Sequence, residues 1–88
     1  MEVVFTKQFN KDIQKIKDKN LALRIEEAII EAKKATSLTQ INNLKKLSGY
    51  KNSYRIRVGD YRIGLYLNKN TLEFARFLNR RDIYRYFP

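Results

Sequence analysis

Residues 53–63 read SYRIRVGDYRI, and this segment decides the kind of fold that we expect. Apolar residues alternate with arginines on both sides of Gly59–Asp60, a pattern typical of two β-strands that each bury one face. Glycine in the first position of a two-residue loop favours a type II′ turn, so the strands form a hairpin. The expected register sets Val58 opposite Tyr61, Arg57 opposite Arg62, Ile56 opposite Ile63 and Arg55 opposite Gly64.

The register gathers the arginines on one face of the hairpin and the apolar side chains on the other. A like-charged pair such as Arg57 and Arg62 costs stability by roughly 0.2 to 1 kcal/mol. The presence of two arginines opposite each other therefore indicates that something other than stability, such as binding, favours positive charge at these positions. The charge of the chain follows the same trend: of a net +10, residues 1–44 carry +2 and residues 45–88 carry +8.

Arginine dominates the second half, which holds seven of the eight arginines. The planar fork of arginine binds phosphate in a bidentate manner, so a phosphate-rich partner is the natural inference. The other interpretation is a solubilising surface. Cysteine and histidine are both absent, which argues against disulfides, zinc sites, and cysteine or serine catalysis that depends on histidine. We expect neither a cofactor nor a metal site.

The remaining pattern predicts a single α+β domain over residues 1–88, without an internal boundary or repeat. A short strand at residues 3–5 precedes a helix capped by Thr6, and a second amphipathic helix runs from Asn20 to about Lys34. We expect the two helices to form an antiparallel hairpin packed on an antiparallel sheet. Residues 35–50 are predicted to be a surface loop with one helical turn near residues 40–44, held down by Leu44 and Leu47.

A second turn at residues 68–70 leads to a strand over residues 71–78. Apolar residues occupy both of its faces, which indicates a central strand or a β-bulge. The final NRRDIYRYFP contains a predicted helical turn beside the arginine face, and Phe87 is predicted to pack on the body of the protein. No apolar run spans a membrane and the first residues do not resemble a signal peptide, so we expect a cytoplasmic protein.

Three stretches resemble the RelE/ParE superfamily of toxin–antitoxin toxins. They are LSGY at residues 47–50, YRIRVGDYRI at residues 54–63 and NRRDIYR at residues 79–85. The resemblance covers the whole chain and implies the order strand, helix, helix and three antiparallel strands, with the first strand beside the last. It also implies an acidic antitoxin as partner. In the RelE branch it implies cleavage of mRNA in the ribosomal A site, with contacts to ribosomal RNA.

The resemblance also suggests a metal-free endoribonuclease reaction, in which the ribose 2′-OH attacks the adjacent phosphorus. Arg62 and Arg80 would hold the scissile phosphate, Arg55 and Arg57 the flanking backbone, and Tyr84 would stack on a base or transfer a proton. Candidate RNA-binding residues around this set are Arg81, Arg85, Lys51, Lys45 and Lys46.

Two positions differ from the common pattern of the family. Arginine stands at positions 55 and 57, where lysine is frequent, and it cannot serve as a general base because it stays protonated. Asn79 stands where related toxins often have histidine. The proton acceptor would then be Tyr84, Asp82 or ribosomal RNA. Two alternatives remain: a ParE-type inhibitor of DNA gyrase, and a non-catalytic module that binds RNA or only its antitoxin and operator.

Overall fold

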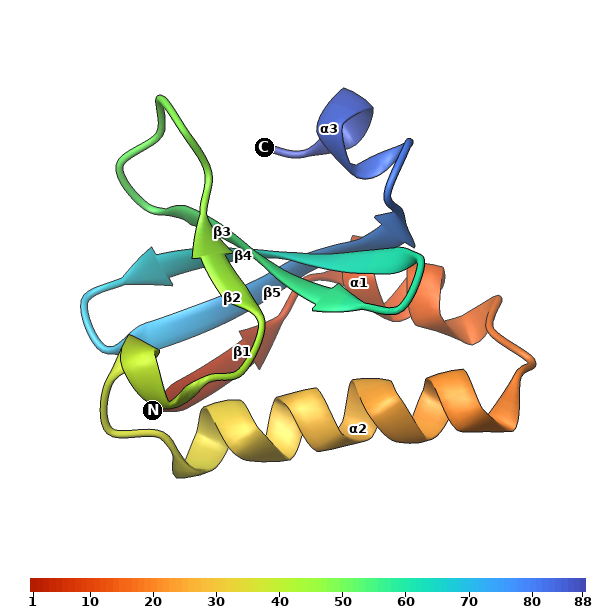
Figure 1. The fold of residues 1–88 in the computed structure, drawn as a ribbon, viewed down its shortest axis with the longest axis horizontal. Helices are drawn as coiled ribbons and strands as arrows, with labels where there is room; N and C mark the ends of the chain where they lie inside the picture. Colours follow the sequence, from red (N-terminus) through yellow and green to blue (C-terminus); the bar gives the residue numbers. More distant parts are fainter.

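The structure, a computed structural model, describes residues 1–88 as a five-stranded sheet with helices on both sides (Figure 1). Helices α1 and α2 pack against one face, which we call the inner face, and α3 lies on the opposite, outer face. None of these helices has the length and apolar character needed to cross a membrane. The elements are β1 (Glu2–Phe5), α1 (Lys7–Gln14), α2 (Lys19–Lys34), a 3₁₀ turn (Leu38–Gln40), β2 (Leu44–Lys46), β3 (Ser53–Val58), β4 (Tyr61–Asn68), β5 (Thr71–Asn79) and α3 (Ile83–Tyr86).

The strand order is β1-β5-β4-β3-β2, so the first strand lies beside the last, as expected. The expectation of an antiparallel sheet is wrong at this one place, because β1 pairs with β5 in the parallel direction. The other three pairings are antiparallel. Four residues with little alternation do not reveal the direction in which a strand pairs.

The β3–β4 hairpin has the predicted register. Arg57 pairs with Arg62 and Ile56 pairs with Ile63 across the two strands. Gly59 has φ +59° and Asp60 does not have a positive φ, which fits a type II′ turn. Because each cross-strand pair shares a face, the arginines of both strands lie on the outer face.

Strand β2 is absent from the sequence prediction, which placed a helical turn near residues 40–44. The helical turn occurs earlier, at Leu38–Gln40, and Asn43 with φ +64° then turns the chain into β2. Three residues are too few to establish a period of two, so pairing with β3 could not be recognised from pattern. The predicted anchors do hold: Leu44 packs against the main core and Leu47 against a smaller cluster on the outer face.

Strand β5 lies inside the sheet, between β1 and β4, and it contains a bulge, which explains its ambiguous pattern. Gly64 pairs with Arg76, but the next residue of β4, Leu65, pairs with Phe74, so Ala75 is the extra residue. The bulge reverses the alternation. Phe74 and Phe77 therefore both belong to the inner core, while Ala75 belongs to the outer cluster.

Capping residues define the two long helices. The Thr6 hydroxyl accepts a hydrogen bond from the Phe9 amide, as predicted, and the Asp18 carboxylate accepts from the amides of Asn20 and Leu21. The second helix accordingly begins at Lys19, one residue before the predicted start, and ends at Lys34 as expected.

The outer face is partly covered by the end of the chain. Ile83 and Phe87 are buried there with Ala75, which agrees with the predicted packing of Phe87. A glycine is required beneath this cluster, since a Cβ at position 64 would lie 2.7 Å from the Phe87 ring. The rest of the outer face, over β2, β3 and the start of β4, carries the charged side chains.

Candidate functional site

The candidate site is the uncovered part of the outer face, where cationic side chains stand on three adjacent strands. Lys45 of β2 pairs with Arg55 of β3, and Arg57 of β3 pairs with Arg62 of β4. Both are like-charged pairs. We call these four residues the cationic face; no acidic side chain forms an ion pair with any of them, because the single ion pair in the chain joins Arg76 to Asp12.

Backbone oxygens orient two of these guanidinium groups without neutralising them. Nη1 of Arg62 donates to the carbonyl oxygens of Gly59, at 2.9 Å, and Tyr61, at 2.8 Å. Nη1 of Arg55 donates to the carbonyl oxygen of Asn43 at 3.2 Å. Arginine has five N–H donors, so most donors of both groups remain available to a ligand.

Arg80 lies at the β3–β4 turn, at the same end of the sheet as Arg62. Its backbone N–H donates to the carbonyl oxygen of Asp60 at 2.8 Å, and its side chain is exposed. The preceding residue, Asn79, shapes the turn: its Oδ1 accepts from the amides of Arg81 and Asp82. Asn79, which the sequence reasoning treated as a missing histidine, thus turns the chain from β5 back over the outer face.

Tyr84 belongs to α3, the helix that lies on the outer face. Tyr84 follows the buried Ile83 and is 61% exposed, and Arg81 and Arg85 are exposed beside it in the chain. The structure therefore places Tyr84 and Arg85 in α3 and Arg81 in the turn that precedes it. The predicted helical turn in this segment is present as α3, although it begins at Ile83 rather than at Arg80.

Two predicted lysines have different positions. Lys51 is exposed in the β2–β3 loop, which rises on the same side of the sheet as α3 (Figure 1). Lys46 pairs with Tyr54 and follows Lys45 directly in β2. Because successive side chains of a strand point to opposite faces, Lys46 belongs to the other face of the sheet. The structure does not bring Lys46 together with the cationic face.

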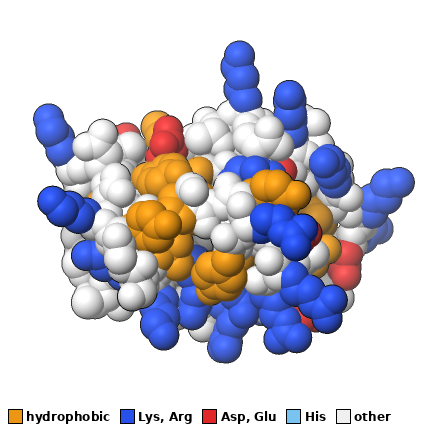
Figure 2. Space-filling model, turned by 90° about the horizontal axis from the view of Figure 1, so that it is seen from above, with side chains coloured by type: hydrophobic (Ala, Val, Ile, Leu, Met, Phe, Trp, Pro, Cys, Tyr) orange, Lys and Arg blue, Asp and Glu red, His pale blue; other side chains and the backbone are white.

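Figure 2 shows the side of the molecule that carries α3. Lysine and arginine side chains surround a hydrophobic area, and acidic side chains are few. The most exposed aromatic residues of the chain are Tyr50, Tyr84 and Tyr86. Of these three, Tyr84 is the candidate for base stacking, because cations beside an exposed aromatic ring are an arrangement with which proteins bind single-stranded nucleic acid.

Sequence reasoning missed Asp12 and Arg76, which form the ion pair noted above. Burial alone would raise the pKa of Asp12, but hydrogen bonds from Arg76, the Phe77 amide and Gln8, together with the charge of Arg76, lower it below the ordinary value of 3.8. The two residues are 64 positions apart, so no local pattern connects them. No three Asp, Glu, Cys or His side chains gather anywhere as a metal site would require.

Known proteins resemble this chain over its full length. Residues 3–84 match the family described as ParE toxin of type II toxin-antitoxin system, parDE. The chain is 44% identical over 89 residues to the toxin RelE3 of Methanocaldococcus jannaschii, with 100% of both chains covered.

Solved structures show the same similarity. The crystal structure of the RelB-RelE antitoxin-toxin complex from Methanococcus jannaschii matches with a TM-score of 0.82 and 42% identity, covering 97% of this chain and 99% of that one. The archaeal RelE-RelB complex from Pyrococcus horikoshii OT3 matches with a TM-score of 0.73 and 24% identity, covering 90% of this chain and 93% of that one. The chain therefore belongs to the RelE/ParE superfamily and is a RelE-like toxin of a type II toxin–antitoxin system.

Proposed function

We propose that the cationic face binds RNA and that this toxin is a metal-free endoribonuclease that cuts mRNA in the ribosomal A site. The proposal is based on two cross-strand pairs of cations, Lys45 with Arg55 and Arg57 with Arg62. No acidic side chain neutralises either pair. Repulsion of this kind opposes folding. A polyanion that binds the folded face relieves it.

Arg62 and Arg80 are assigned to the scissile phosphate. Both belong to the end of the sheet at the β3–β4 turn, and Nε and Nη2 of Arg62 make no internal hydrogen bond. These two nitrogens form the edge of the guanidinium that binds phosphate in a bidentate manner. Positive groups fixed before the reaction stabilise the charge that develops when the 2′-OH attacks phosphorus.

Arg55 and Arg57 are assigned to the flanking phosphates, and Lys45, Lys51, Arg81 and Arg85 to the periphery. Proton transfer requires a different group, because arginine remains protonated. Asp82 already accepts a hydrogen bond from Asn79, whereas the Tyr84 hydroxyl is exposed and unpaired. The proton acceptor is accordingly Tyr84, Asp82 or a group of the ribosomal RNA, and the variants Tyr84→Phe and Asp82→Asn distinguish them.

An acidic antitoxin is the proposed protein partner. The two archaeal relatives were solved as complexes of RelE with RelB. A partner with negative charge would offset part of the net +10 of this chain and compete with RNA for the same face.

The decisive experiment adds purified toxin to ribosomes programmed with mRNA and maps the new 5′ ends. We expect cuts within A-site codons, and a loss of cleavage rate of roughly 100-fold or more in Arg62→Ala and in Arg80→Ala, by analogy with removal of other charge-stabilising groups. The matched control is Lys33→Ala, which removes one positive charge at the far end of α2. Thermal unfolding of each variant confirms that it is folded.

Intact message would refute the proposed cleavage. The second candidate is a ParE-type function, because residues 3–84 match the ParE toxin family. Gyrase–DNA complexes trapped by the toxin would support it. RNA that is bound but never cut would indicate a non-catalytic module.

A further inference from the structure

Helix α3 contains only four residues, so its position must be determined by contacts with the rest of the protein. A helix of one turn has no stability of its own in water. Ile83 and Phe87 supply the first contacts, since both are buried against the outer face. These two apolar anchors hold one side of the helix down, whereas Tyr84 and Tyr86, which are two residues apart, leave the helix on different sides and are exposed, so Tyr86 needs a contact of its own.

Arg76 of β5 supplies the contact for Tyr86. Its guanidinium carbon lies 5.8 Å from the centroid of the Tyr86 ring, within the range of a cation–π interaction. Tyr86 is 56% exposed, so burial contributes little to holding this ring in place. The contact with Arg76 is therefore the interaction that holds Tyr86, and with it the rotation of α3 about its axis, in one orientation.

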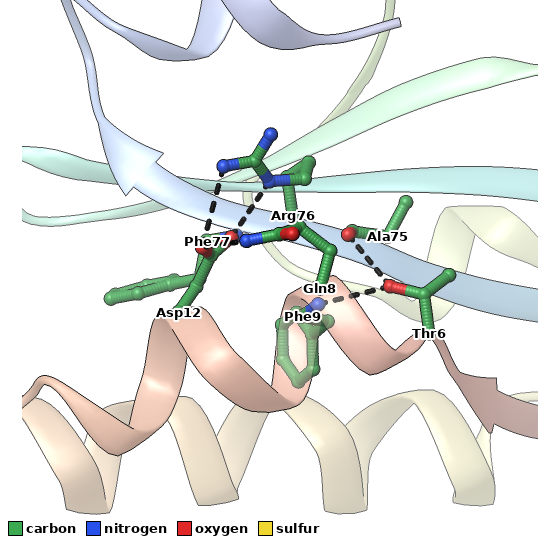
Figure 3. Close-up of polar contacts among 7 residues, drawn as sticks. All are labelled: Thr6, Gln8, Phe9, Asp12, Ala75, Arg76 and Phe77. Atoms are coloured by element: carbon green, nitrogen blue, oxygen red, sulfur yellow. Dashed lines mark hydrogen bonds and ion pairs between the residues drawn. The ribbon is translucent and has the colours of Figure 1, made fainter.

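Arg76 is in turn fixed by Asp12 of α1, as Figure 3 shows. Its Nε donates to Oδ2 of Asp12 at 2.8 Å, and its Nη2 donates to Oδ1 at 3.3 Å. Two bonds to one carboxylate set the plane of the guanidinium. The face of that plane is then available to the Tyr86 ring.

Asp12 is held by two more hydrogen bonds, which makes it a rigid support. Its Oδ2 accepts from the Phe77 amide at 2.9 Å, and its Oδ1 accepts from Nε2 of Gln8 at 3.2 Å. Only 4% of Asp12 is exposed. The lowered pKa of its carboxyl keeps it ionised at neutral pH, so its attraction for Arg76 persists there.

We propose that Asp12, Arg76 and Tyr86 form a positioning relay that orients α3, and thereby Tyr84, on the outer face of the sheet. The relay connects α1, β5 and α3, three elements from both ends of the chain. None of its members touches RNA in this proposal; each acts through the next. The consequence for cleavage rests on the function proposed above, whereas the orientation of α3 does not.

Amide hydrogen exchange measured by NMR tests the relay directly. The amides of Tyr86 and Phe87 donate to the carbonyl oxygens of Asp82 and Ile83, so they report on α3. In Tyr86→Leu and in Arg76→Gln we expect them to exchange about two- to fivefold faster, the loss that corresponds to an exposed cation–π contact. Amides in the centre of β4, such as that of Leu65, should be unchanged. Tyr86→Phe keeps the ring and should restore wild-type exchange.

The matched control is Tyr50→Leu. It removes another exposed tyrosine, but one that makes no cation–π contact with an arginine. Unchanged exchange at α3 in Tyr86→Leu would overturn the relay. So would an increase spread evenly over the sheet, which would mean general destabilisation, or a Tyr86→Phe variant as fast as Tyr86→Leu. The Tyr86 variants decide the question even if Arg76→Gln does not fold.

A second readout connects the relay to cleavage. In single-turnover assays, Tyr86→Leu should lower the cleavage rate severalfold while RNA affinity stays within about twofold, because the cationic face is intact. If Tyr86→Leu lowered RNA affinity but left the cleavage rate unchanged, the role of the relay in positioning Tyr84 would be contradicted. If the wild type does not cleave at all, the proposed function fails, and the exchange measurements still decide the relay.

Discussion

At the residue scale, Asp12 shows how one carboxylate completes an incomplete strand pairing. Strand β1 ends at Phe5, so beyond Phe74 the free edge of β5 has no strand beside it. The Thr6 hydroxyl donates to the Ala75 carbonyl oxygen, and Asp12 accepts from the Phe77 amide (Figure 3). Two side chains thus satisfy backbone groups that would otherwise be buried without partners.

Asp12 also predicts a pH dependence of stability. Because its pKa is lower in the folded protein than the ordinary 3.8, its contribution is complete above about 3.8 and is lost as the pH falls toward the folded pKa. We expect Asp12→Asn to lower the free energy of unfolding by roughly 1 to 3 kcal/mol at neutral pH. Urea denaturation at several pH values measures this difference.

The gap between wild type and Asp12→Asn should narrow steadily below about pH 3.8. Lys and Arg charges repel one another equally in both proteins, so general acid destabilisation cancels in the comparison. A gap that stays constant down to about pH 2 would show that hydrogen bonding, and not the ionised carboxylate, provides the stabilisation.

At the element scale, the β3–β4 hairpin places like charges opposite one another, and this arrangement predicts a conflict between stability and binding. Replacing Arg57 by threonine removes the repulsion with Arg62 and introduces a residue that strands favour. We expect Arg57→Thr to raise the free energy of unfolding by roughly 0.2 to 1 kcal/mol. RNA affinity should fall in the same variant.

Lys46→Thr is the matched control for this prediction. Lys46 is an exposed strand residue too, but it pairs with Tyr54 and not with a cation. It should show neither the gain in stability nor the same loss of RNA affinity. Thermal or urea unfolding together with fluorescence anisotropy on a labelled RNA gives both quantities, and a less stable Arg57→Thr would contradict the proposed conflict.

The same hairpin shows what sequence can and cannot predict. A strict alternation over eleven residues determined the turn, the register and the common face of Arg55, Arg57 and Arg62. Strand β2 has only three residues, so its pairing with β3 depends on a neighbour and not on its own pattern. The direction of β1 was unpredictable for the same reason.

The candidate site was predictable in part for related physical reasons. Residues within one hairpin share a face by geometry alone. Arg80 and Tyr84 reach the outer face through the turn at Asn79 and the packing of Ile83 and Phe87, which depend on tertiary contacts. The Asp12–Arg76–Tyr86 relay joins three distant segments, and no spacing rule relates them.

At the scale of the whole molecule, the net charge of +10 predicts a strong salt dependence of RNA binding. Each phosphate contact made by a cation contributes about 0.7 to the slope of log affinity against log salt concentration for a single strand. We expect Arg80→Ala to reduce that slope by about this amount, because one phosphate contact is lost.

Lys33→Ala removes the same charge from the end of α2 and should leave the slope nearly unchanged. Titrations of a short RNA at several salt concentrations measure both slopes. Equal slopes for the two variants would mean that overall charge, and not a defined arginine contact, determines binding.

The parallel pairing of β1 with β5 also has a consequence for how this toxin is made. The strand partners of residues 2–5 are residues 71–74, so the first strand stays unpaired until that late segment of the chain has been synthesised. Such distant closure is slow compared with local folding. Until β5 and α3 are in place, the arginines of β3 and β4 lack the neighbouring strand and the helical turn that complete the outer face. The outer face therefore becomes complete only after residues 71–87 have joined the fold.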